Sequence, residues 1–188
     1  MLPDGAGLIA ALKLMGTPIQ ERLPGCEFVE HLCKRAAHSG WKVFFFGGKP
    51  GVAEVAAKKM QEKYDGLIVA GCRNGYFKEE DTADICEEIK NSGADILFVG
   101  LGVPKQEYWL MDNLEKTSAF VGIGIGGSMD VISGNLKRAP KLWQKMKLEW
   151  LYRTIQEPYR WRRLLGLPVF VFHVVLTKFH LDNYKDNK

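Results

Sequence analysis

Apolar and polar residues along this chain form blocks with two different periods. Short apolar runs, rich in β-branched and aromatic residues, alternate with longer stretches whose apolar residues recur at helical spacing. This pattern predicts strands at 42–46, 67–71, 96–100 and 120–125, and helices at 7–15, 26–39, 52–64, 79–92, 105–114 and from 128 onwards. Nearly continuous apolar strands separated by helices predict right-handed βαβ units. The expected fold is therefore α/β, with a Rossmann-like parallel sheet and helices on both of its faces.

The pattern changes after Gly134, where a basic and tryptophan-rich segment precedes an apolar run at 164–176. That run is shorter than the ~20 residues that span a bilayer, and Gly166 and Pro168 interrupt it. We therefore expect an α/β core at 1–136 and a basic, aromatic helical appendage at 137–188. Two roles stay open for the appendage: it lies in an anionic membrane interface, or it packs as a helical pair on the core or on another subunit of a homo-oligomer.

Composition and charge narrow the class of protein. The 188 residues are 46% hydrophobic and 26% charged, which is typical of one globular domain rather than of a disordered chain. The four cysteines form no CxxC pair and indicate free thiols in a reducing compartment. The first residues lack a basic stretch followed by an apolar one, so a cytoplasmic protein is expected. Nine basic and two acidic residues between Lys137 and Arg163 call for an anionic partner, and a nucleic acid is not the partner we expect.

Residues suited to binding a phosphorylated small molecule follow the last two predicted strands. Lys105 and Gln106 begin a helix, and Gly126, Gly127 and Ser128 form a turn at the start of another. Ligands of open α/β sheets bind beyond the carboxyl ends of the strands. Lysine can neutralise a phosphate, glutamine can bond a sugar or base, and a glycine turn can hold a diphosphate. Both groups also have a purely structural alternative. Lys105 and Gln106 can form a solvated first helical turn, and Gly126–Ser128 can form a tight strand-to-helix turn.

Other candidates have a structural alternative as well. Tyr76, in the loop that begins at Asn74, can stack on a base or sugar, or can wedge the next helix in place. Asp4 can act as a general base or cap the first helix. Arg22 can clamp a diphosphate or pair with a neighbouring glutamate.

Two familiar motifs are incomplete or absent. The 122–127 segment has the GxGxxG pattern, but it follows the last strand and no acidic residue comes about twenty positions later, so NAD is disfavoured. The chain has no Asp-x-Asp motif, which argues against a metal holding a nucleotide diphosphate. We expect neither a cofactor nor a metal.

Eight strings, taken together and in order, resemble the WecG/TagA/CpsF glycosyltransferases of bacterial cell-surface polymer synthesis. They are LPDG (2–5), ERLPG (21–25), FFGGKPG (45–51), NGYF (74–77), GADILFVGLGVPKQE (93–107), GIGGSMD (124–130), KRAP (137–140) and LEWLYR (148–153). The resemblance covers essentially the whole chain. It implies transfer of N-acetylmannosamine, or a related sugar, from a UDP donor to polyprenyl-diphosphate-linked N-acetylglucosamine. It also implies inversion without a metal, and a peripheral position on the inner face of the plasma membrane with an appendage that closes the active site.

The resemblance assigns roles by position. Asp4 matches the proposed catalytic base, Arg22 and Gln106 match polar active-site positions, and the Gly126–Ser128 turn matches the region near the donor diphosphate. Family members often have histidine where Asn74 stands, which bears on donor preference. Basic residues of the appendage are physical candidates to offset charge on UDP or on the lipid diphosphate, namely Arg153, Arg160 and Arg163.

Family members also carry a segment before the LPDG string, whereas this sequence starts almost at Asp4. A fragment, a misassigned start and a shortened homologue are the three alternatives that follow. Two alternatives to an active transferase follow from the sequence. One is a truncated, inactive module that binds a UDP-sugar or a lipid diphosphate. The other is a Rossmann oxidoreductase, which rests on the 122–127 glycines alone.

Overall fold

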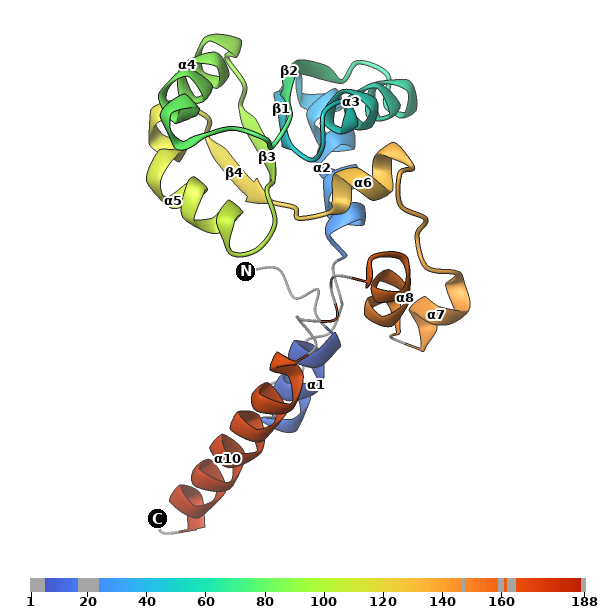
Figure 1. Ribbon diagram of the computed structural model, residues 1–188, viewed down its shortest axis with the longest axis vertical. Helices are drawn as coiled ribbons and strands as arrows, with labels where there is room; N and C mark the ends of the chain where they lie inside the picture. Colours follow the sequence, from blue (N-terminus) through green and yellow to red (C-terminus); the bar gives the residue numbers. More distant parts are fainter. Residues whose placement is uncertain (1–5, 17–23, 147, 159–160, 162–164, 187–188) are drawn as a thin grey trace. The chain divides into compact units, whose positions relative to one another are not determined.

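The computed structural model describes residues 6–16, 24–146, 148–158, 161 and 165–186 (Figure 1). The chain divides into two compact units. One comprises Gly25–Lys137, and the other combines Met1–Pro24 with Arg138–Lys188.

The first unit is built on four parallel strands, β1 (Lys42–Gly47), β2 (Ile68–Arg73), β3 (Ile96–Gly100) and β4 (Val121–Gly124). Their order in the sheet is β2-β1-β3-β4, so the two strands that come first and third in the sequence lie at the centre. Each strand begins and ends within two residues of its prediction. The predicted α/β fold with a parallel, Rossmann-like sheet is confirmed.

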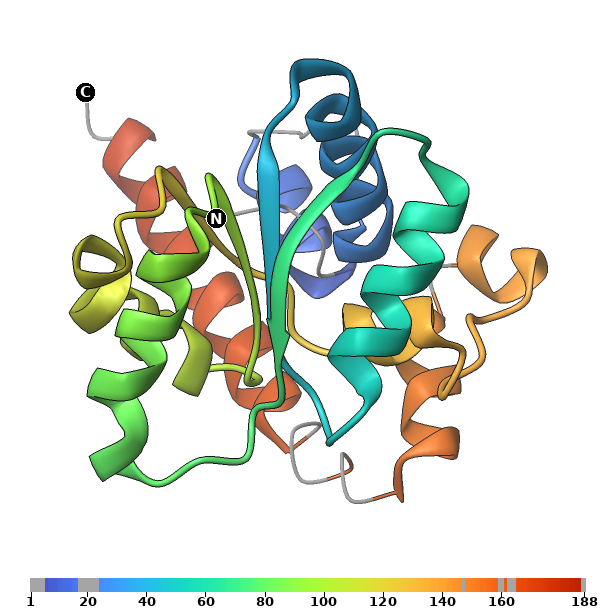
Figure 2. The ribbon, with the colours of Figure 1, turned by 90° about the horizontal axis from the view of Figure 1, so that it is seen from above.

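Helices cover both faces of this sheet (Figure 2). One face carries α2 (Gly25–Ser39), α3 (Val52–Lys63) and α6 (Ser128–Ser133), and the other carries α4 (Thr82–Ser92) and α5 (Lys105–Thr117). Successive side chains of a strand point to opposite faces. In β1, every residue from Val43 to Phe46 is therefore buried, because Val43 and Phe45 enter one core and Phe44 and Phe46 enter the other.

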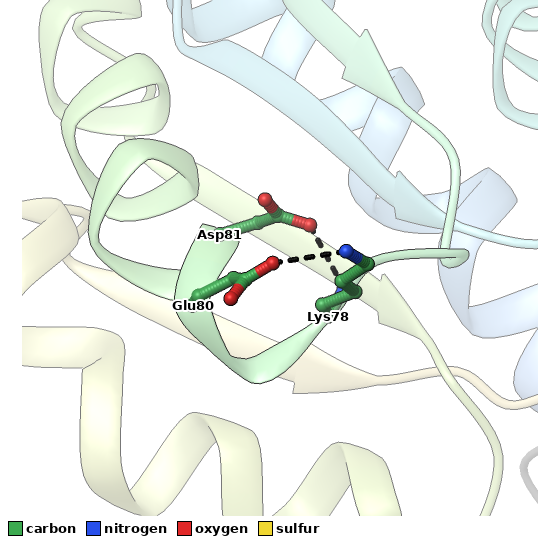
Figure 3. A network of polar contacts seen from close by, with 3 residues as sticks. All are labelled: Lys78, Glu80 and Asp81. Carbon is green, nitrogen blue, oxygen red and sulfur yellow. Dashed lines mark hydrogen bonds and ion pairs between the residues drawn. The ribbon is translucent and has the colours of Figure 1, made fainter.

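The connection between β2 and α4 is fixed by a short polar network (Figure 3). A 3-10 turn, η1 (Glu79–Asp81), precedes α4. The Lys78 N–H donates to Asp81 Oδ2 at 2.8 Å, and Lys78 Nζ donates to Glu80 Oε1 at 3.0 Å. A carboxylate that accepts from a backbone N–H three residues earlier satisfies a donor that the helix itself cannot pair.

The second unit contains α1 (Ala6–Leu14), α7 (Lys141–Lys145), α8 (Glu149–Gln156) and α10 (Gly166–Asp186). α1 lies beside α10 (Figure 1), and Lys178 Nζ donates to the Leu14 carbonyl at 2.8 Å. α10 exposes large apolar side chains on several of its sides: Val169, Phe170, Val171, Phe172, Val175 and Leu176. Within the described residues, no helix combines the length and apolar character that crossing a bilayer requires.

All four cysteines are free thiols, with Cys33 and Cys86 buried and Cys26 and Cys72 half-buried. Burial raises the pKa of the Cys33 thiol to about 12, and the nearby charge of Glu30 adds to the rise. Burial also raises the pKa of Cys72 to about 11. These thiols are therefore protonated at neutral pH and behave as small apolar side chains.

The sheet core sets the stability of the first unit. Phe98 is fully buried, and its ring centroid lies 5.2 Å from that of Phe45. We expect Phe98→Ala to lower the free energy of unfolding by about 3–5 kcal/mol, because it removes this contact and leaves a cavity. Urea denaturation followed by circular dichroism measures the change. Val55→Ala, at a position 44% exposed, serves as the control, and an equal loss in both variants would contradict the assignment of the core.

Candidate functional site

Glycine backbones pack directly against one another at the carboxyl ends of the strands. The Gly48 N–H donates to the Gly100 carbonyl at 3.1 Å, and the Gly75 N–H donates to the Gly48 carbonyl at 2.8 Å. A Cβ at Gly47 would lie 2.5 Å from the carbonyl carbon and oxygen of Gly100. The loops after β1, β2 and β3 are thus joined into one continuous edge, and these glycines are needed for the close approach of the loops.

Gln106 joins the fourth strand to the same edge. Its side chain is 3% exposed, and its Oε1 accepts from the Gly126 N–H at 3.0 Å, while its Nε2 donates to Glu107 Oε1 at 2.9 Å. A Cβ at Gly124 would lie 2.5 Å from Nε2, so the side chain of Gln106 occupies the space that Gly124 leaves open. In this structure Gln106 holds the glycine turn in place, which makes it a positioning residue.

The Gly126–Ser128 turn itself is tightly specified. Gly126 has φ of +52°, which favours glycine, and Gly127 directly precedes α6. The Ser128 N–H donates to the Ile125 carbonyl at 3.1 Å, and the residue is 5% exposed. The segment forms the tight strand-to-helix turn that the sequence left open as its structural role, and its contact with a diphosphate stays a prediction.

Lys105 supplies a positive charge at this edge. It is the exposed first residue of α5, and its Nζ lies 4.3 Å from the centroid of the Phe77 ring. Phe77 in turn lies 5.5 Å from the ring of Phe46 in the core. A cation over an aromatic face is attracted by the ring quadrupole, so this contact favours a position of the ammonium group beside the strand ends.

The loop that carries Phe77 is fixed at both of its ends. The Tyr76 N–H donates to Asn74 Oδ1 at 2.9 Å, and the Lys78–Asp81 bond closes the other end (Figure 3). The ring of Tyr76 is 67% exposed, as a residue that stacks on a ligand needs to be. Sequence reasoning missed the roles of Phe77 and Lys78. A carboxylate three residues after Lys78 is the signal that could have revealed the cap.

Seven of the candidate residues are thereby placed along one edge of a single unit: Asn74, Tyr76, Lys105, Gln106, Gly126, Gly127 and Ser128. Arg153 belongs to the other unit, where it is half-buried in α8 and its carbonyl accepts from the Glu157 N–H at 2.9 Å. Four candidates lie outside the described residues: Asp4, Arg22, Arg160 and Arg163. Among the described side chains, no group of three or more His, Cys, Asp or Glu residues could hold a metal ion.

Comparison with known proteins adds independent information. The model of the Glycosyl transferase WecG/TagA/CpsF family matches residues 1–184. A Bacillus spizizenii protein is 37% identical over 175 residues, which are 93% of this chain and 67% of the relative. Proteins of Bacillus subtilis and of Staphylococcus aureus strain MW2 are each 34% identical, and the matches cover 68% and 72% of their lengths. All three are named N-acetylglucosaminyldiphosphoundecaprenol N-acetyl-beta-D-mannosaminyltransferase. The family predicted from the eight strings is confirmed.

The contact between Gly124 and Gln106 can be tested by a double-mutant cycle. We expect Gly124→Ala to destabilise the protein by about 1–3 kcal/mol, because the new methyl group displaces the Gln106 side chain. In a Gln106→Ala background the same change should cost much less, since the clashing atoms are gone. Urea denaturation of the four proteins gives the coupling.

Gly51→Ala is the matched control for that cycle. Gly51 has φ of +86°, and a Cβ there would meet nothing within 4 Å. Its substitution should cost only backbone strain, by the same amount with or without Gln106. A cost of Gly124→Ala that does not depend on Gln106 would contradict the described geometry.

Proposed function

Because the chain belongs to the glycosyl transferase WecG/TagA/CpsF family, we propose that it transfers N-acetylmannosamine, or a related sugar, from a UDP donor to polyprenyl-diphosphate-linked N-acetylglucosamine. The observation that carries this proposal is the family match over residues 1–184, supported by relatives whose names state this sugar and this acceptor. The product would enter the synthesis of a cell-surface polymer such as a teichoic acid or an exopolysaccharide.

The edge of the first unit supports binding of the donor there. A nucleotide diphosphate needs positive charge, backbone donors and a surface for its base. Lys105 provides an ammonium group over Phe77, and Tyr76 provides an exposed ring. The Gly126–Ser128 turn lies close to the strand ends, although the N–H groups of Gly126 and Ser128 already donate within the protein. Gln106 contributes by holding the turn, because both ends of its amide already bond within the protein.

The proposed reaction inverts the anomeric carbon of the donor sugar. Asp4 accepts the proton of the acceptor hydroxyl as that oxygen attacks the anomeric carbon. The new carbon–oxygen bond forms while the bond from that carbon to the donor phosphate breaks, and UDP leaves with the electron pair. Arg22, Arg153, Arg160 and Arg163 are proposed to offset the negative charge of UDP or of the lipid diphosphate.

A lipid-linked acceptor requires the enzyme to work at a membrane surface. We assign this contact to the C-terminal segment, on the inner face of the plasma membrane. Its support is the combination of exposed apolar side chains along α10, including Phe170 and Phe172, with the basic residues between 137 and 163. Apolar groups and cations together favour an anionic interface. Self-association through the same exposed apolar side chains would instead give a homo-oligomer in the absence of lipid.

A second candidate function is binding of a UDP-sugar or lipid diphosphate without turnover. The observation that favours it is that Lys105 and Tyr76, at the edge of the described sheet, suit binding of a phosphate and a base, and neither is a general base. A binding module would hold UDP and leave the acceptor unchanged.

Transfer of labelled N-acetylmannosamine from its UDP donor to a short-chain polyprenyl-diphosphate N-acetylglucosamine tests the proposal. We expect turnover, and we expect Asp4→Asn to reduce it by at least about 100-fold, because the amide cannot accept the proton. Asp65→Asn, at an exposed position after α3, is the control and should keep full activity. UDP binding with no turnover in the unchanged protein would favour the binding module. Equal activity in both variants would remove Asp4 from the mechanism.

Binding of UDP gives a separate test that needs no turnover. We expect Lys105→Ala to weaken UDP about tenfold in titration calorimetry, because one charge-assisted contact to a phosphate is lost. Lys58→Ala is the matched control, since Lys58 is an exposed lysine of α3 whose side chain pairs with Glu62. The loss should shrink as salt rises. An unchanged affinity in Lys105→Ala would place the diphosphate elsewhere.

A further inference from the structure

Gln106 and Glu107 are neighbours in the first turn of α5, and their side chains bond to each other. Gln106 Nε2 donates to Glu107 Oε1 at 2.9 Å. Successive residues of a helix point about 100° apart, so such neighbours do not ordinarily face each other. Gln106 is buried, whereas Glu107 is exposed. The bond therefore links a buried amide to a carboxylate at the surface, and helix geometry alone does not produce it.

The two partners of the Gln106 amide permit only one orientation of it. The Gly126 N–H can only donate, and the carboxylate of Glu107 only accepts. The amide oxygen therefore faces Gly126 at 3.0 Å, and the amide nitrogen faces Glu107. A reversed amide would place two donors together at Gly126 and two acceptors together at Glu107. Such an arrangement is unfavourable for a buried side chain, because its polar atoms would lose their partners.

The Gln106 amide joins parts of the first unit that lie on different faces of the sheet. α5 covers one face and α6 covers the other (Figure 2). The turn to which Gln106 bonds leads from β4 into α6. A Cβ at Gly124, the last residue of β4, would lie 2.5 Å from Gln106 Nε2, so the nitrogen that bonds Glu107 also packs against the end of the strand. The orientation of one amide thus affects both β4 and the turn.

We infer that Glu107 is a positioning residue, which fixes the orientation of the Gln106 amide and, through it, the Gly126–Ser128 turn. This role holds whichever reaction the protein catalyses. Its consequence for a ligand rests on the proposed function, because the donor diphosphate is proposed to bind at the edge that includes the turn. The negative charge of Glu107 itself opposes a diphosphate. A favourable contribution of Glu107 to donor binding therefore passes through Gln106.

Hydrogen exchange of the Gly126 amide, measured by NMR on the unliganded 188-residue chain, tests this inference. Glu107→Ala removes the acceptor, and Glu107→Gln keeps one, because its side-chain oxygen still accepts from Gln106. We expect exchange at Gly126 to become about five- to tenfold faster in Glu107→Ala and to stay within about twofold in Glu107→Gln. The Gly75 amide, which donates to the Gly48 carbonyl at the same edge, is the internal control and should not change.

A background without the Gln106 amide isolates the route of the effect. In Gln106→Ala, the further change Glu107→Ala should have no influence on Gly126, because the connecting side chain is missing. Unchanged exchange at Gly126 in the Glu107→Ala single variant overturns the inference. An equal change in Glu107→Ala and Glu107→Gln also overturns it, because it would report the lost charge rather than the lost acceptor.

Titration calorimetry with UDP tests the consequence for the donor. Both substitutions remove a negative charge two residues from Lys105, and that loss alone should strengthen UDP binding equally in both. With the turn at the diphosphate, Glu107→Ala should instead bind UDP at least about threefold more weakly than Glu107→Gln. Faster exchange at Gly126 in Glu107→Ala, with equal UDP affinity in both variants, supports the positioning role and contradicts the proposed place of the donor. Absence of UDP binding in the unchanged protein contradicts the proposed function alone.

Discussion

Contact between glycine backbones at the carboxyl ends of β1, β2 and β3 is the constraint on which the candidate site depends. A Cβ at Gly47 would collide with the backbone of Gly100 at 2.5 Å, and a Cβ at Gly75 would lie 2.8 Å from the Leu101 side chain and 3.1 Å from the Gly47 Cα. The loops beyond the strands are short and hydrogen-bonded to one another, so the side chains that they carry have defined positions. Tyr76 and Lys105 depend on this arrangement, because the loop after β2 also carries the ring on which Lys105 rests.

Close packing at the strand ends also determines the role of Gln106. A polar side chain that is buried must find partners within the protein, and Gln106 finds them in Gly126 and Glu107. Its amide therefore joins the start of α5 to the turn before α6. In this structure Gln106 is an internal support for the turn, and the substrate contact expected of it stays a prediction.

The two outer strands of the sheet differ in the features that discourage pairing with a further strand. β2 carries a bulge and a terminal charge pair, as an outer strand does. β4 carries neither and borders an apolar pocket.

Much of the fold was determined by the sequence alone. Alternating apolar periods identify strands and helices from local residues, and the family strings identify the protein class because their order and spacing are specific. Lys105, Asn74, Tyr76 and the Gly126–Ser128 turn could be placed at strand ends by the same reasoning, although their ligand roles remain predictions. Tertiary structure alone decided that Gln106 faces the glycine turn, that Phe77 contacts Lys105, and that β2 and β4 are the outer strands of the described sheet. Each of these depends on residues that are distant in the chain and meet only when the strands pair and the helices pack. Local periodicity carries no information about such contacts.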